Sequence, residues 1–99
     1  MRKVYVFRTQ YLGQVPMMHD GKVVHEVVGN ATAKLVRFNE EQYEGKAELL
    51  NYARQHRLGD TAFLTQEEAA AEARKRLELR IEGLRDELKR HETALEQLP

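Results

Sequence analysis

The chain has 99 residues, with 16 basic and 16 acidic side chains and therefore no formal net charge. A nucleic-acid-binding domain usually carries a basic excess and a mimic of nucleic acid an acidic one, so the total charge supports neither class. There is no cysteine, which excludes disulfides and thiolate metal sites. No apolar stretch approaches a membrane span or the core of a signal peptide, so we expect a cytoplasmic protein.

The length and the pattern predict one structural unit of α+β class, with a head over residues 1–64 and a long helix over residues 65–99. The head should begin with a small antiparallel β-meander of three or four strands. Its first strand, Lys3–Thr9, is rich in β-branched and aromatic residues. Val4 and Val6 fall on one face and Tyr5 and Phe7 on the other, so we expect both faces to be covered.

Turn residues divide the rest of the meander. Asp-Gly within His19–Lys22 tolerates the positive φ of a tight hairpin, so a return strand is predicted over 22–28. Gly29-Asn30 is a second predicted turn, and Ala31–Phe38 the next strand.

One helix is expected to pack on this sheet. Asn39 is a candidate N-cap with Gln42 in the capping-box position, and Leu58-Gly59 is a candidate C-cap. Gly45 interrupts the pattern, which places the ordered start near Lys46. The short apolar segment Thr61–Leu64 is expected to add an edge strand to the meander.

The long helix begins at a capping box, Thr65-Gln66-Glu67-Glu68, in which a Thr hydroxyl satisfies a free N–H group of the first turn. Apolar residues then recur at alternating steps of four and three, the spacing of a coiled-coil seam. The seam consists of Leu77, Ile81, Leu84, Leu88, His91, Leu95 and Leu98.

Charged side chains beside the seam indicate how two copies would pair. In a parallel homodimer Arg80 faces Arg85 and Glu87 faces Glu92, so both contacts are repulsive. Antiparallel copies with Ile81 level with Leu84 bring opposite charges together. The facing pairs are then Glu78 with Arg85 and Arg80 with Glu87. The signs therefore favour an antiparallel homodimer, although each exposed pair contributes only about 0.2–1 kcal/mol.

An intramolecular role for the seam is the alternative. Leu79 lies outside the seam, and small residues at 69–71 and 73 permit close packing against the head. The two roles are compatible if this alanine turn docks on the head and the leucine part extends beyond it.

The sequence offers little support for an enzyme. It contains no serine or cysteine nucleophile, no Gly-rich phosphate-binding loop and no histidine pair with metal-ligand spacing. We expect no catalytic residue, no metal and no cofactor.

Two surfaces are candidates for binding a partner. Tyr11, Leu12, Met17 and Met18, with Val15, form a cluster with few charges, of a kind enriched at protein interfaces, with core packing as the alternative. Basic residues over 74–90 are candidates for contacting nucleic acid. Acidic residues interleave with them, and Glu72–Arg76 and Asp86–Arg90 are (i, i+4) partners, which favours a solvated, salt-bridged face.

A short β-meander, a helix, and then Phe63-Leu64-Thr65-Gln66-Glu67-Glu68-Ala69 opening a long charged helix resembles the organisation of small phage and mobile-element accessory proteins, among them anti-CRISPR inhibitors. The resemblance implies a non-catalytic protein that blocks a host enzyme or complex by surface contact, and it carries over no functional residues. The alternative is a nucleic-acid-associated regulator that uses the basic residues of the long helix.

Overall fold

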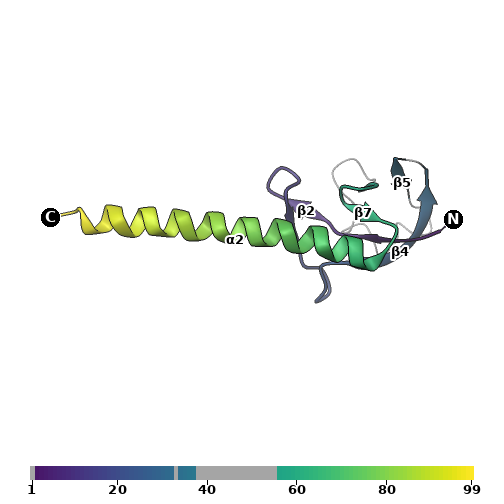
Figure 1. The fold of residues 1–99 in the computed structure, drawn as a ribbon, viewed down its shortest axis with the longest axis horizontal. Helices are drawn as coiled ribbons and strands as arrows, with labels where there is room; N and C mark the ends of the chain where they lie inside the picture. The colour runs from purple at the N-terminus through teal and green to yellow at the C-terminus, as the bar shows by residue number, and fades with distance from the viewer. Residues whose placement is uncertain (1, 33, 38–55) are drawn as a thin grey trace.

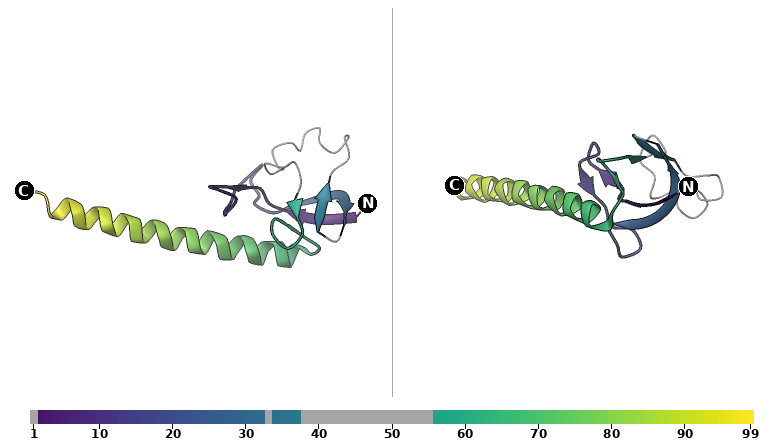
Figure 2. Two further views of the ribbon diagram at one scale, coloured as in Figure 1. Left: turned by 90° about the horizontal axis from the view of Figure 1, so that it is seen from above. Right: turned by 45° about the vertical axis from the view of Figure 1, so that its right-hand side comes forward.

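The computed structural model describes residues 2–32, 34–37 and 56–99. It has a small β-rich head and one long helix that extends far beyond it, with extents of 62 × 24 × 23 Å (Figure 1). This arrangement confirms the predicted α+β class. The two views of Figure 2 show the helix leaving the head as an almost straight rod.

The main sheet has five strands in the order β6-β5-β4-β1-β7, each antiparallel to its neighbours. The strands are β1 (Arg2–Val6), β4 (His25–Ala31), β5 (Leu35–Arg37), β6 (His56–Arg57) and β7 (Ala62–Phe63), and a separate hairpin pairs β2 (Thr9–Gln10) with β3 (Val15–Pro16). The expected edge strand at 61–64 is confirmed as β7, which lies beside β1 rather than beside β6. A parallel bridge between Leu58 and Ala62 links the two ends of the sheet, so the sheet curls back on itself.

Strand β1 is covered on both faces, as its sequence predicts. Val4 and Val6 point into one cluster of buried apolar residues together with Val27, Val36 and Ala62. On the other face Tyr5 packs against a second cluster beneath the long helix. In this cluster the ring of Phe7, just after β1, stacks on Phe63 at 5.9 Å between centroids. The head therefore has two small cores, and the second one needs the helix.

The structure confirms one predicted turn and corrects the other. Asp20 and Gly21 have φ of 50° and 73°, and His19 and Lys22 exchange backbone hydrogen bonds across them. The strand that follows begins at His25, not at residue 22, and continues through Gly29-Asn30, so the predicted turn there is wrong. Gly29 pairs with Arg2 in the ladder, which a local pattern does not reveal.

After β4, hydrogen bonds join Thr32 to Leu35 instead. Thr32 donates its N–H to the Leu35 carbonyl at 2.8 Å, and its hydroxyl accepts from the Leu35 N–H at 3.1 Å. Hydroxyl-to-backbone bonds of this kind stabilise turns. The next strand, β5, consequently begins at Leu35 rather than at residue 31.

Most of the predicted head helix, residues 39–55, lies outside the described residues. Its predicted end at Leu58-Gly59 is wrong, because His56 and Arg57 form β6 and His56 pairs with Val36. Gly59 does adopt the positive φ, 85°, that the prediction required. It does so in the turn between β6 and β7, where the N–H of Asp60 donates to the carbonyl of Arg57 at 3.1 Å.

Helix α2 spans Gln66–Glu96 and begins as the capping box predicts, with the Thr65 hydroxyl accepting from the Glu68 N–H at 3.2 Å. Ala69 and Ala73 are buried against the head. We call Gln66–Arg80 the docked half and Ile81–Glu96 the projecting half. Among the described residues, no helix is both long and apolar enough to cross a membrane.

Candidate interaction surface

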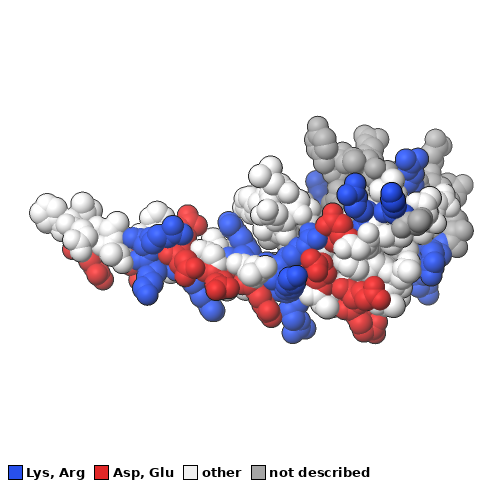
Figure 3. Space-filling model, turned by 45° about the horizontal axis from the view of Figure 1, so that its top comes forward, with Lys and Arg blue, Asp and Glu red and all other residues white. Residues whose placement is uncertain are grey.

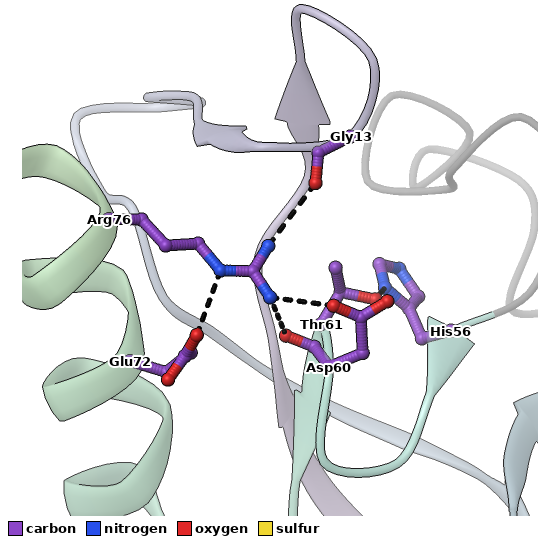
Figure 4. Close-up of polar contacts among 6 residues, drawn as sticks. All are labelled: Gly13, His56, Asp60, Thr61, Glu72 and Arg76. Atoms are coloured by element: carbon purple, nitrogen blue, oxygen red, sulfur yellow. Dashed lines mark hydrogen bonds and ion pairs between the residues drawn. The ribbon is translucent and has the colours of Figure 1, made fainter. Parts of the chain in front are cut away.

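Arg76 fastens the docked half to the head. Its guanidinium donates to the Asp60 carboxylate at 2.6 Å, to the Asp60 carbonyl at 3.0 Å and to the Gly13 carbonyl at 3.2 Å (Figure 4). The Nε–H donates to Glu72 one turn earlier at 3.0 Å. One side chain thus joins the helix to the β2–β3 loop and to the β6–β7 turn.

The surroundings of Arg76 favour its charged form. Burial by itself would lower the pKa of Arg76, but the hydrogen bonds and charges of Asp60 and Glu72 outweigh that effect and raise it. The guanidinium also lies over the ring of Phe7, 5.3 Å from its centroid. The predicted pair of Glu72 and Arg76 is confirmed, but this arginine belongs to the interior side of the helix and not to a solvated face.

The β2–β3 loop is strained and presents apolar side chains outward. Tyr11, Leu12 and Gly13 all have positive φ, a conformation that costs about 1–2 kcal/mol for each residue that is not glycine. Leu12 is fully exposed, and the ring of Tyr11 lies 5.1 Å from the guanidinium carbon of Arg80. The Arg76 bond to the Gly13 carbonyl and the Arg80 stacking therefore tie this loop to the helix.

The residues of the predicted partner surface differ in their exposure in the structure. Tyr11, Leu12 and Met18 are exposed, whereas Met17 is half-buried and Val15 is buried. The exposed three lie on two different loops, one after β2 and one after β3.

The seam lies on one side of α2 and is mostly uncovered. Leu77 is half-buried next to the head, and the later apolar members are 44–70% exposed. These members are Ile81, Leu84, Leu88, Leu95 and Leu98. His91 is also exposed, with its ring 3.7 Å from Glu87. The alanine turn thus docks on the head while the leucine part extends beyond it, which is the arrangement in which the two roles of the seam are compatible.

The charges beside the seam are available for contacts outside the chain. Within the part of the chain that the structure describes, neither Glu78 nor Arg85 forms an ion pair. Arg80 contacts the Tyr11 ring and Glu87 contacts His91, each on its own protomer. Figure 3 shows basic and acidic groups alternating along the helix rather than separating into a basic stripe.

A groove runs along the docked half on the side of the seam. Its apolar walls are formed by Val23 and Val24 of the loop before β4 and by helix residues Ala70, Ala73, Leu77 and Ile81, and its volume is about 310 Å³. Arg74 and Glu78 lie at its rim. We call this feature the alanine groove. It continues directly into the exposed leucines of the projecting half.

His56 forms a buried hydrogen bond that the sequence did not indicate. His56 is fully buried, and its Nδ1 lies 3.0 Å from the Thr61 hydroxyl (Figure 4). The rings of His19 and His25 contact each other in a tilted arrangement, 5.6 Å between centroids, and His19 lies 3.4 Å from Asp20. Across residues 2–32, 34–37 and 56–99, no three side chains of His, Asp or Glu gather into a group that could hold a metal ion.

Arg76 and the alanine groove are the two features of this surface that sequence analysis missed. The only local signal for Arg76 was the Glu72 spacing, which is equally typical of an exposed helix. Comparison of the chain with protein-family models, with curated proteins and with solved structures found no match.

Proposed function

We propose that the chain is a non-enzymatic protein-binding module that acts as an antiparallel homodimer held together by α2. The observation that supports it is the row of exposed leucine-type side chains on the projecting half. Fully burying such a side chain contributes about 1.5–3 kcal/mol before the cost of association. Four of them in one row, Ile81, Leu84, Leu88 and Leu95, therefore provide a substantial driving force.

The exposure of the projecting half also supports a partner. Most helical stability in proteins comes from packing of an apolar face. The apolar seam residues of the projecting half are 44–70% exposed. A second helix along this face would supply the missing packing.

Charge complementarity selects the orientation. With Ile81 level with Leu84 of the second copy, Glu78 faces Arg85, and both are without an ion pair in the described chain. Arg80 then faces Glu87. A two-fold axis makes each contact occur twice.

The dimer carries its two heads at opposite ends, each presenting the strained Tyr11–Leu12 loop. Tyrosine and other large apolar side chains on a loop that is held in place bind protein surfaces at low entropic cost. We propose that the partner is a host protein or protein complex, and that the module inhibits a bacterial defence complex, as the organisation of its sequence implies. The cytoplasmic location stays a prediction.

Sedimentation of the full chain tests the dimer. At high micromolar concentration the wild type should sediment at twice the mass of the chain, and Leu84→Lys should sediment as a folded monomer. Leu79→Lys is the matched control, because Leu79 is similarly exposed on the same helix but lies outside the seam. A monomeric wild type, or equal effects of the two substitutions, would contradict the proposal.

A charge reversal tests the orientation. Arg85→Glu turns the contact with Glu78 repulsive in the antiparallel dimer, so the dissociation constant should rise several-fold. In a parallel dimer the same change would place Glu opposite Arg80 and strengthen association. The double variant Glu78→Arg with Arg85→Glu should restore the wild-type constant if the copies are antiparallel.

A further inference from the structure

The antiparallel register has a consequence for the head, because it brings the end of one α2 onto the docked half of the other. When Ile81 is level with Leu84, Leu77 is level with Leu88 and Ala70 with Leu95. Ala70 and Leu77 are walls of the alanine groove. Any helix that pairs with the seam in this register must therefore run through the groove.

We propose that the head is part of the dimer interface, and that the alanine groove receives the C-terminal end of α2 of the second copy around its Leu95. This proposal rests on the proposed antiparallel dimer and adds the contact with Val23 and Val24. The groove then has a defined occupant rather than an unspecified apolar partner.

The shapes and sizes of the facing residues fit this assignment. The helix wall of the groove is low where the chain has Ala70 and Ala73, and the second copy supplies a large side chain, Leu95, at that level. A small residue facing a large one is the way in which packed layers interdigitate. Ala73 and Ala94 are both flanking g positions of the heptad, and such positions face each other in an antiparallel pair, so two small side chains meet there.

The polar groups at the rim are also compatible with this occupant. Arg74 lies level with His91 of the second copy, and Glu78 lies near its Arg85. His91 is accompanied by Glu87 on its own helix at 3.7 Å, so an acidic group accompanies the basic ones there.

Disulfide trapping tests the contact directly, since the chain contains no cysteine of its own. The double variant Val24→Cys with Leu95→Cys places one thiol in the groove and one near the end of α2. Val24 lines the same groove as Ala70. Leu95 lies 25 residues beyond Ala70, about 37 Å along a helix that rises 1.5 Å per residue, so the thiols at 24 and 95 cannot meet within one chain. Mild oxidation should convert most of the full-length variant into a covalent dimer on a denaturing gel.

Two further pairs make the outcomes distinguishable. Ala70→Cys with Leu95→Cys reports the helix–helix register without the head, and Val28→Cys with Leu95→Cys is the control, because Val28 is exposed on β4 and is not a wall of the groove. A covalent dimer from the variants at positions 70 and 24, but not from the variant at position 28, supports the inference. A covalent dimer from the variant at position 70 alone supports the antiparallel dimer and overturns the contact with the head. If none of the three variants forms a covalent dimer although the chain sediments as a dimer, the register is wrong and the inference falls with it. If the chain sediments as a monomer, the proposed function itself is wrong.

Discussion

The docked and projecting halves of α2 continue one heptad pattern but meet different surroundings. The docked half has small residues on its inner side, Ala69 and Ala73, and these are buried against the head. The leucines of the projecting half lie on the neighbouring face of the helix, the seam, and they are exposed. One face of α2 thus packs within the chain over the docked half, and an adjacent face carries the row that we propose packs between chains.

The polar contacts of the two halves differ in the same way. Arg76 reaches two other segments of the chain. Among the described residues, Arg90 in the projecting half donates only to the Asp86 carbonyl one turn earlier, at 3.5 Å. An arginine in the same (i, i+4) arrangement with an acidic residue is structural in one half and a surface group in the other. Substitutions in matched pairs can test this difference.

The largest effect is expected at Arg76. Arg76→Ala removes several charge-assisted bonds and leaves the Asp60 carboxylate without its cation, which should lower the free energy of unfolding by about 2–4 kcal/mol. Arg90→Ala should change it by less than about 0.5 kcal/mol. Urea unfolding in a Leu84→Lys background, where the proposed dimer does not contribute, measures both. Similar losses for the two variants would show that Arg76 does not fasten the helix.

The parts of this fold that the sequence predicts are those determined by neighbouring residues. The Thr65 cap, the Asp20-Gly21 turn and the two-faced strand β1 follow from local chemistry, and the structure confirms them. The errors come from long-range contacts. Gly29 continues a strand because Arg2 pairs with it, and His56 is extended because it pairs with Val36.

The same limit applies to the site. The seam and its flanking charges can be recognised from spacing alone, because all of them lie on one helix. The alanine groove needs the loop at Val23-Val24 to lie beside that helix, and the role of Arg76 needs Gly13, which is 63 residues away in the chain. No local pattern contains this information.

A smaller effect is expected for the buried hydroxyl of Thr61. Thr61→Val keeps the shape of the side chain but removes the hydrogen bond to His56, which is fully buried, so the free energy of unfolding should fall by about 1–3 kcal/mol. Thr93→Val in the projecting half is the matched control. It removes an exposed hydroxyl that donates to the Lys89 carbonyl at 2.9 Å, and it should have almost no effect. Equal unfolding midpoints for the Thr61 variant and the wild type would contradict a stabilising role for this bond.

The smallest expected effect is a pH dependence at His25, the first residue of β4, which follows the groove residues Val23 and Val24 in the chain. Burial lowers the pKa of His25, the nearby His19 lowers it further, and the bond to the Lys22 carbonyl acts in the opposite direction. Because the folded state binds this proton less tightly than the unfolded state, its stability falls as the pH drops through about 6.5, the usual value for histidine, towards the lowered one. His25→Gln and His25→Asn remove the titration, so both should lose less stability than the wild type between about pH 7.5 and about pH 5.5. Thermal unfolding at the two pH values, again in the Leu84→Lys background, gives the comparison. If the wild type and both variants lose the same stability between the two pH values, the titration of His25 does not contribute to the pH dependence of the head.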